Sequence, residues 1–170
     1  MVIILLAEGF EELEALSPLD ILRRENIDVK TVGIKSKTVT GSHGITVIAD
    51  LTPEEVDLNE VELAIFPGGM PGTLNLDASV FTNEVISSVT SRGCMLAAIC
   101  AAPLILGRRG LLMGKRAICF PGFENELKGA IISSRGVETD GLITTAKDYA
   151  HAFEFGHTLA KEIKLFRGEN

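Results

Sequence analysis

The sequence has little positive charge. Lysine and arginine number 16 against 23 aspartate and glutamate residues, which gives a formal net charge of −7 at pH 7. Proteins bind nucleic acids and anionic membranes largely through positive charge that displaces counterions. This composition therefore argues against both a nucleic-acid partner and a membrane partner.

Long apolar runs are also missing. The longest stretch, Met95 to Leu106, contains Pro103 and is shorter than the roughly 20 residues that cross a bilayer. The first run, Val2 to Ala7, has no basic segment before it and meets Glu8 at once, so it does not have the form of a signal peptide. We expect neither a membrane span nor a secretory leader from these segments.

Cysteine is scarce and lacks metal-binding spacing. Cys94, Cys100 and Cys119 are an odd number and include no C-x-x-C pair. This pattern predicts neither a disulfide framework nor a zinc ribbon, and we expect no metal site. Free thiols of this kind favour a cytoplasmic location, because the cytoplasm is reducing.

Apolar content, in contrast, is ample. Hydrophobic residues make up 46% of the 170 residues, low-complexity tracts are absent, and the length favours a single domain over residues 1–170. Short β-rich runs alternate with helical stretches, and several of the strand-like runs are apolar throughout. This alternation predicts an α/β fold with a mainly parallel sheet.

Periodicity, glycine and proline set the expected elements. The pattern predicts strand 2–7, helix 11–24, strand 29–34, a hairpin of 37–39 and 44–49, a short helix 53–59, strand 61–66, helix 80–91, strand 95–99, helix 101–109, strands 116–119, 131–133, 137–139 and 142–145, and helix 149–166. Pro18 lies inside the first helix and is expected to kink or split it. Sites in such sheets form where strands end, which singles out Phe66-Pro67-Gly68-Gly69 and Ile99-Cys100-Ala101-Ala102.

Cys100 is the strongest candidate for chemistry. It follows an expected strand and precedes an expected helix, and such a turn holds a nucleophile at the edge of a sheet. A helix N-terminus would stabilise its thiolate. Lowering a thiol pKa by about 3 needs about 4 kcal/mol, of which a helix terminus supplies about 2 at most, so a second partner is required. The alternative is a buried core residue, and we assign Cys94 and Cys119 to that class.

Two further features could complete a site at Cys100. The N–H groups of Gly69 and Ala101 could form an oxyanion hole, although ordinary turns also use glycine pairs. Glu14 shares a helix face with Pro18, and an apolar setting there would favour a protonated carboxyl that donates a hydrogen bond to a thiolate. A solvated helix face is the alternative interpretation of Glu14.

The neighbouring acids and the histidines carry weaker signals. Glu11 and Glu12 fall in the first turn of the same helix and are expected to be exposed. His43 lies in the expected hairpin turn and His151 in the first turn of the last helix, and a Cys–His pair would need contact in space. A structural role is the first interpretation of each histidine.

Several motifs occur in order along nearly the whole chain. They are Val2–Ala7 followed by Glu11-Glu12-Leu13-Glu14, Leu22-Arg23-Arg24, Phe66-Pro67-Gly68-Gly69 with Gly72 and Asn75-Leu76, Ala97-Ala98-Ile99-Cys100-Ala101-Ala102-Pro103, Asp140-Gly141-Leu142-Ile143-Thr144-Thr145, and Phe153-Glu154-Phe155. With these motifs the sequence resembles the ThiJ/PfpI superfamily, and specifically its parkinsonism-associated deglycase branch. The Ala-Ile-Cys-Ala segment in register with Glu-Glu-x-Glu is the most specific part of the resemblance.

The resemblance implies a flavodoxin-like, three-layer α/β/α sandwich that forms a homodimer, with the first helix near the interface. It implies that Cys100 is an oxidation-prone nucleophile beside a protonated Glu14, with the amides of Gly69 and Ala101 nearby. The matched Leu22-Arg23-Arg24 segment adds Arg24 to the possible auxiliary residues.

The activities that the resemblance implies need no cofactor. They are conversion of 2-oxoaldehydes (methylglyoxal or glyoxal) to hydroxy acids, as in a glyoxalase III-type lyase, and deglycation of early glycation adducts, both in defence against carbonyl and oxidative stress. The alternative is a non-enzymatic redox sensor or chaperone-like stress protein whose Cys100 is oxidised to sulfinic acid. Protease members carry a histidine directly after the cysteine, so Ala101 argues against peptide hydrolysis.

Two positions depart from the family pattern. Phe120 stands where several members have a histidine near the cysteine, and Asp148-Tyr149-Ala150-His151 replaces a Gly-Pro-Gly-Thr-like stretch. Proton transfer would then depend on Glu14, or on His43 or His151 as a substitute.

Overall fold

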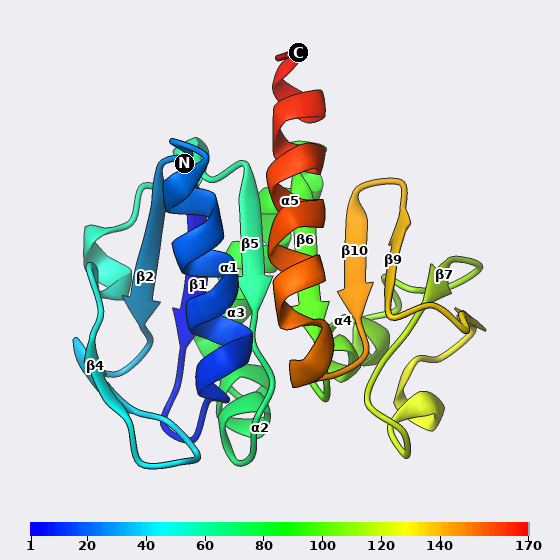
Figure 1. Ribbon diagram of the computed structural model, residues 1–170, viewed down its shortest axis with the longest axis horizontal. Helices are drawn as coiled ribbons and strands as arrows, with labels where there is room; N and C mark the ends of the chain where they lie inside the picture. The colour runs from blue at the N-terminus through cyan, green and yellow to red at the C-terminus, as the bar shows by residue number, and fades with distance from the viewer. Residues whose placement is uncertain (170) are drawn as a thin grey trace.

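A six-stranded sheet with the order β2-β1-β5-β6-β10-β9 forms the centre of the computed structural model, which describes residues 1–169 (Figure 1). Each pairing between neighbours is parallel except that of β9 with β10. The strands are β1 (Val2–Leu6), β2 (Val29–Gly33), β5 (Leu63–Phe66), β6 (Met95–Ile99), β9 (Val137–Asp140) and β10 (Ile143–Ala146). The predicted α/β fold with a mainly parallel sheet is confirmed.

Helices and two small sheets complete the fold. The small sheets pair β3 (Thr38–Thr40) with β4 (Thr46–Ile48), and β7 (Arg116–Ala117) with β8 (Ile131–Ile132). The α-helices are α1 (Glu12–Arg24), α2 (Gly72–Asp77), α3 (Val80–Ser91), α4 (Pro103–Arg108) and α5 (Ala152–Arg167). Short 3-10 helices are η1 (Pro53–Glu55), η2 (Leu58–Glu60), η3 (Glu124–Glu126) and η4 (Tyr149–His151). Among residues 1–169, no helix has both the length and the apolar character needed to cross a bilayer.

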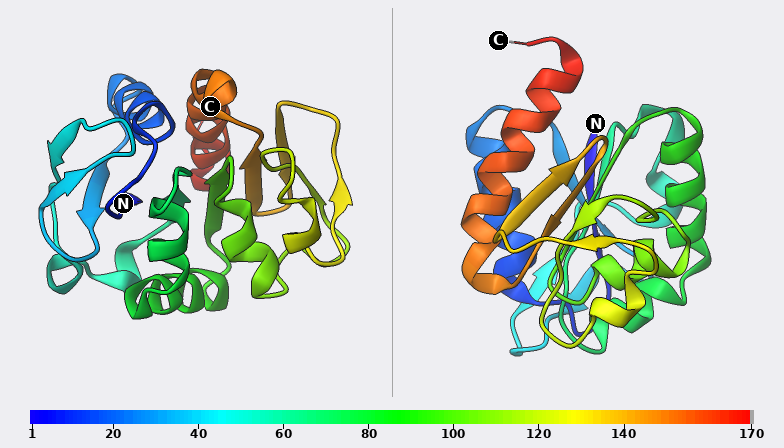
Figure 2. Two further views of the ribbon diagram at one scale, coloured as in Figure 1. Left: turned by 90° about the horizontal axis from the view of Figure 1, so that it is seen from below. Right: turned by 90° about the vertical axis from the view of Figure 1, so that its right-hand side faces the viewer.

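The helices cover both faces of the sheet and make three layers (Figure 2). Helices α1 and α5 lie on one face, and α3 and α4 lie on the other. Because side chains alternate along a strand, Ile4 of β1 faces the α1–α5 layer while Ile3 and Leu5 face the α3–α4 layer. Strands that are apolar throughout thus supply both halves of the core.

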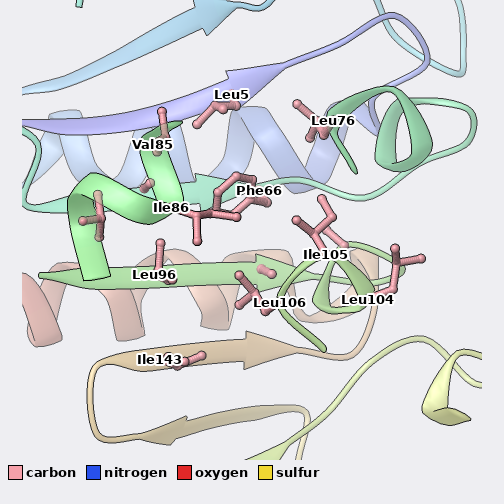
Figure 3. Packing of buried hydrophobic residues seen from close by; sticks show 14 of the residues in the cluster. Leu5, Phe66, Leu76, Val85, Ile86, Leu96, Leu104, Ile105, Leu106 and Ile143 are labelled. Carbon is pink, nitrogen blue, oxygen red and sulfur yellow. The ribbon is translucent and has the colours of Figure 1, made fainter. Parts of the chain in front are cut away.

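The core beneath α3 and α4 holds the end of β5 in place. In Figure 3, Leu5, Phe66 and Leu96 from neighbouring strands lie against the side chains of Val85 and Leu106. Phe66 is the last residue of β5 and is fully buried. Its burial fixes the point at which the following Pro-Gly-Gly loop leaves the sheet.

Parallel pairing brings the loops of interest to one edge of the sheet. Phe66 pairs with Ala98, and Ile99 pairs with Ala146, so β5, β6 and β10 end nearly level. The loop after Phe66, the turn at Cys100 and the segment after Ala146 therefore emerge side by side, at the lower ends of these strands in Figure 1.

Of the two outcomes expected at Pro18, a kink or a split, the split does not occur, because α1 continues from Glu12 to Arg24. Proline removes one helical hydrogen bond. Helix α5 packs closely at this point: a Cβ built on Gly156 would lie 3.0 Å from Pro18 Cα and 2.7 Å from the Ile21 side chain. We attribute the continuity of α1 to this packing, since tertiary contacts supply most of a helix's stability in proteins.

The remaining differences from prediction are local. Helix α2 was not expected, and the expected helix 53–59 is instead the pair η1 and η2. The helix predicted over 101–109 starts at Pro103, because Ala101 and Ala102 form a turn. The hairpin, the strand 95–99 and the helix 80–91 are confirmed.

Candidate active site

Cys100 occupies a strained turn immediately after β6. Its φ angle is +65°, in the left-handed region that costs a residue with a Cβ about 1–2 kcal/mol. Two backbone hydrogen bonds hold it there: its N–H donates to Ala146 O (2.9 Å), and its carbonyl accepts from Phe120 N (2.8 Å). Such strain collects at functional sites, and the tight turn predicted directly after the strand is present at Cys100.

The Pro-Gly-Gly loop after β5 is locked to the start of α1. Glu11 N donates to Gly68 O at 2.8 Å. Gly69 has a φ of +92°, and a Cβ on it would lie 2.6 Å from Gly9 O. A Cβ on Gly68 would press on Glu14 Oε2 and lie 2.7 Å from Cys100 Cβ. Because neither Gly68 nor Gly69 has a side chain, the loop can pack closely against the start of α1 and against Cys100.

Glu14 is fully buried beside Cys100. Its Oε2 accepts a hydrogen bond from Gly68 N at 2.9 Å, while its Oε1 has no partner. Burial raises the pKa of Glu14 to about 7, against the neighbouring Cys100 thiol and the Gly68 N–H, which lower it, and the charges of Glu11 and Asp148 raise it further. Glu14 thus lies in a buried setting, as predicted, and not on a solvated helix face.

The predicted thiolate at Cys100 needs a correction. Burial raises the pKa of Cys100, and the charge of Glu14 raises it further, while the backbone amides of Ala101 and Gly69 lower it. The stabilising donors are thus these two amides rather than α4, which begins only at Pro103. As long as Glu14 is ionised, Cys100 keeps its proton, so a thiolate at neutral pH requires the proton to be on Glu14.

The chemistry open to this arrangement follows from its parts. A thiol and a carboxyl group lie together and compete for one negative charge, as coupled acids do. The N–H groups of Gly69 and Ala101 face the sulfur and are placed to stabilise an oxyanion that forms on an attached carbon. The unpaired Glu14 Oε1 is a ready proton donor or acceptor.

Glu12 is not exposed, contrary to expectation. It is 3% exposed and accepts hydrogen bonds from His43 N (2.7 Å), His43 Nδ1 (2.9 Å) and Ile45 N (3.3 Å). These bonds tie the β3–β4 turn to α1 and raise the pKa of His43. Glu11, Glu12 and His43 also lie close enough together to bind a cation, but both Glu12 oxygens already have partners in the protein.

The possible auxiliary residues do not reach the sulfur. Within residues 1–169, His43 pairs with Glu12 and His151 Nδ1 pairs with Asp148 Oδ1 (2.7 Å), and neither ring forms a hydrogen bond with Cys100. Arg24 lies at the far end of α1, roughly 15 Å along the helix axis from Glu14, and pairs with Asp20. Arg24 is therefore not part of the Cys100 site of its own chain.

The other cysteines are structural, as predicted. Cys94 is 9% exposed and Cys119 is 1% exposed, and all three thiols are free. Burial raises the pKa of Cys119 to about 12. Phe120 is adjacent to Cys100 through its backbone hydrogen bond, as expected, and provides no titratable group there.

Surface cavities do not single out Cys100. The largest one described, of about 740 Å³, lies between the loop at Lys35, the segment at Pro53 and the start of α3. A second, of about 370 Å³, adjoins the start of α1 and is lined by Glu11, Glu12, Leu13, His43, Ile45 and Tyr149. The site is therefore identified by the strained backbone of Cys100 and by the burial and hydrogen bonding of Glu14, not by a cavity.

Two features of this site were not predicted from the sequence. Gly68 N–H holds Glu14, and the only available signal was the first glycine of the Pro-Gly-Gly loop. The negative charge of Asp148 raises the pKa of Glu14. In the sequence, Asp148 was noted only as part of the segment that departs from the family pattern.

Comparison with known proteins gives consistent matches along the chain. The model of the DJ-1/PfpI family matches residues 1–162. The chain is 34% identical over 166 residues to protein DJ-1 homolog B of Arabidopsis thaliana, a match that covers 95% of this chain but 38% of that protein. It is 35% identical over 130 residues to a Pyrococcus abyssi protein named as a deglycase, covering 76% of this chain and 77% of that one.

Solved structures give the same result for the fold. The structure of oxidized DJ-1 from Toxoplasma gondii superposes with a TM-score of 0.88 at 29% identity, covering 99% of this chain and 97% of that chain. The three-layer, flavodoxin-like arrangement is thus the one found in DJ-1 proteins.

Proposed function

Because this chain belongs to the DJ-1/PfpI family, we propose that it is a cysteine-dependent enzyme acting on small 2-oxoaldehydes. It converts methylglyoxal or glyoxal to the hydroxy acid, or removes early glycation adducts, without a cofactor. The observation that carries the proposal is the strained turn at Cys100 beside the buried carboxyl group of Glu14, whose Oε1 has no hydrogen-bond partner. A relative at 35% identity named as a deglycase supports it.

The reaction begins with the proton on Glu14 and the negative charge on Cys100. The sulfur bonds to the aldehyde carbon, the carbonyl electron pair moves to oxygen, and the amides of Gly69 and Ala101 stabilise that oxyanion. Glu14 gives its proton to the oxygen, which yields a neutral hemithioacetal and a Glu14 carboxylate.

The same carboxylate then rearranges the adduct. It removes the proton from the former aldehyde carbon and returns it to the neighbouring carbonyl carbon through an enediol, which leaves a thioester on Cys100. Water cleaves the thioester and restores the thiol and carboxyl pair. One carbon is oxidised and its neighbour is reduced, so methylglyoxal and water give lactate with no external oxidant.

Lactate formation from methylglyoxal tests this function. We expect Cys100→Ser and Glu14→Gln to lose the activity, because they remove the nucleophile and the proton carrier. Cys94→Ser is the matched control, because Cys94 is a buried cysteine that directly precedes β6 as Cys100 directly follows it, and this variant should keep the activity. Lactate formation that survives in Cys100→Ser, purified in the same way, would end the proposal.

A second candidate is a redox function of the same thiol. Two equivalents of peroxide would convert Cys100 to its sulfinic acid with release of two waters, and the unpaired Glu14 Oε1 is placed to bond a sulfinate oxygen. The absence of a titratable side chain at Phe120 favours this role. Intact-mass analysis after peroxide treatment distinguishes the two: gain of two oxygens at Cys100 without lactate turnover supports the redox role, and no oxidation at modest peroxide counts against it.

The assembly and setting of the protein are proposals as well. We place a homodimer interface at the first helix, where Leu13 of α1 and Phe153 of α5 are exposed. Leu13→Glu should shift the mass in light scattering from dimer to monomer, and an unchanged mass would refute this interface. A cytoplasmic setting remains a prediction that rests on the free thiols.

A further inference from the structure

A cavity of about 370 Å³, which we call the α1 cavity, lies at the start of α1. Its walls come from the first turn of α1, the β3–β4 turn and the 3-10 helix η4, and its lining residues are Glu11, Glu12, Leu13, His43, Ile45 and Tyr149. Ligand pockets in proteins have volumes of about 300–1,000 Å³. In Figure 1 the first turns of α1 and α5 lie at the same lower end of the molecule as the carboxyl ends of β5 and β6.

Two walls of the α1 cavity belong to segments that contact the Cys100 turn. Glu11 N donates to Gly68 O at 2.8 Å, and a Cβ on Gly68 would lie 2.7 Å from Cys100 Cβ. Tyr149 follows Ala146 by three residues, and Ala146 O accepts a hydrogen bond from Cys100 N at 2.9 Å. The α1 cavity therefore lies beside the Cys100 turn without including the sulfur.

The buried side chains of the α1 cavity are acidic. Glu12 is 4% exposed, and both of its oxygens accept hydrogen bonds from His43 or Ile45. Glu11 is 12% exposed, and its Oε2 accepts from Glu14 N at 2.8 Å. Glu11 Oε1 lies 3.8 Å from His43 Nδ1 and accepts no hydrogen bond from any residue between 1 and 169. Two carboxylates and one imidazole carry a net charge of −2 or −1, so the cavity attracts a cation whether or not His43 is protonated.

Tyr149 adds an aromatic ring to the same cavity. Its side chain is 59% exposed, and it is the first residue of η4. Asp148 caps η4 by accepting from Ala150 N (3.1 Å) and from His151 Nδ1 (2.7 Å), which fixes the backbone that carries the ring. A free carboxylate oxygen and an exposed aromatic ring suit a guanidinium group, which pairs with carboxylates through its N–H groups and stacks on aromatic faces.

Other cations fit the α1 cavity less well. A metal ion held by Glu11, Glu12 and His43 would have to displace the bond between His43 Nδ1 and Glu12 Oε2, which are 2.9 Å apart. A guanidinium group needs only Glu11 Oε1 and the ring. An ammonium group is more strongly hydrated and has no planar face to stack.

We propose that the α1 cavity is a second binding site of this protein, which takes the guanidinium group of an arginine residue in a peptide chain. Glu11 Oε1 accepts from its N–H groups, and the Tyr149 ring stacks on its planar face. Binding there does not require that Cys100 turn over oxoaldehydes. Leu13 on the rim also belongs to the dimer interface proposed above, so the contacts are assigned to Glu11 and Tyr149.

The protein has its own reporter for this site, because Tyr149 is its only tyrosine and it has no tryptophan. Titration of the full chain with N-acetylarginine methylamide at constant ionic strength should change the tyrosine fluorescence saturably. N-acetylcitrulline methylamide, which has nearly the same shape without the charge, should bind at least about 10-fold more weakly. Equal binding of these two compounds would overturn the inference.

Two further probes define the ligand class. N-acetyllysine methylamide should bind more weakly than the arginine compound, and equal binding would overturn the choice of a guanidinium group. Free L-arginine should bind no more tightly than the blocked compound, because only the side chain enters the cavity. Tighter binding of free L-arginine would identify the free amino acid as the ligand and overturn the assignment to a peptide.

Variants test the two contacts separately. Glu11→Gln keeps an oxygen for Glu14 N but loses the charge, so binding should weaken roughly 5- to 20-fold. Tyr149→Ala should weaken binding roughly 2- to 5-fold, measured by amide NMR because no tyrosine remains, whereas Tyr149→Phe should bind like wild type. Glu84→Gln is the matched control, because Glu84 lines the separate cavity of about 740 Å³ together with Phe81. Unchanged binding in both Glu11→Gln and Tyr149→Ala would overturn the inference, as would an equal loss in Glu84→Gln.

Fluorescence also separates this site from the enzymatic proposal. A protein that binds the arginine compound selectively but forms no lactate from methylglyoxal retains the arginine site and loses the proposed function. Lactate formation without selective binding of the arginine compound retains the function and rejects the arginine site.

Discussion

Replacing Glu14 by glutamine should change how the stability of the protein depends on pH. Glu14 has a pKa raised by burial from its ordinary value of 4.5 to about 7. In the unfolded chain it ionises near 4.5, so between these values the folded state binds more protons than the unfolded state. The stability that this protonation gives is fully present below pH 4.5 and is lost as the pH rises to 7.

The magnitude follows from the size of the change. Each pKa unit corresponds to about 1.4 kcal/mol, so keeping the first proton of the Glu14–Cys100 pair until about pH 7, instead of 4.5 as for Glu14 in the unfolded chain, costs about 3 kcal/mol above pH 7, whichever of the two groups then carries the charge. Glutamine has nearly the same shape, can accept from Gly68 N and does not titrate. We therefore expect Glu14→Gln to gain about 3 kcal/mol relative to wild type between pH 4.5 and 8, with the difference levelling off above pH 7.

Urea unfolding of both proteins at half-unit steps from pH 4.5 to 8.5, under reducing conditions, measures this difference. Glu154→Gln is the control, because it removes a glutamate from an exposed position of α5. Parallel stability curves for wild type and Glu14→Gln would refute the account, since they would mean that Glu14 ionises alike in the folded and unfolded chains.

Other predictions concern packing and the surface. Gly68→Ala should lower Tm by about 3–10 °C and slow Cys100 alkylation, because the new methyl group separates Glu14 from Cys100. Gly156→Ala crowds α1 against α5 and should lower Tm to a similar extent, but its alkylation rate should stay at the wild-type value; a loss of reactivity in both would show that overall destabilisation is the cause. Arg167→Met should destabilise the protein by about 1 kcal/mol at pH 7, because Arg167 holds the pKa of Glu62 down at about 2. That difference should shrink as the pH falls from 4.5 towards 2, and a difference constant with pH would contradict it.

Much of this site could be predicted from sequence because it lies at the ends of strands. Cys100 follows an apolar strand directly, and in a parallel sheet the carboxyl ends of the strands meet at one edge. The loop containing Gly69 comes after another such strand, which is enough to bring the two together. The setting of Glu14 followed from helical periodicity, since it shares a face with Pro18.

The parts that failed depend on contacts between distant segments. Glu12 looks like an exposed first-turn acid, and only the β3–β4 turn, more than thirty residues further along, buries it. Pro18 looks like a helix breaker, and only the close approach of α5 at Gly156 offsets the lost hydrogen bond. The influence of Asp148 depends on the register of β10 against β6, which local patterns do not specify. The pKa of Cys100 depends on the protonation state of its neighbour.

The central claim is that Cys100 can carry the negative charge at neutral pH because Glu14 holds the proton. The most direct measurement is thiolate absorbance at 240 nm, taken as the difference between wild type and Cys100→Ser across pH 5 to 10. We expect a thiolate to appear by about pH 7 to 8 in wild type, and at higher pH when Glu14 is replaced by leucine, which cannot donate a hydrogen bond. A sulfur that stays protonated until above pH 9 in both proteins would place the charge on Glu14 and contradict the account.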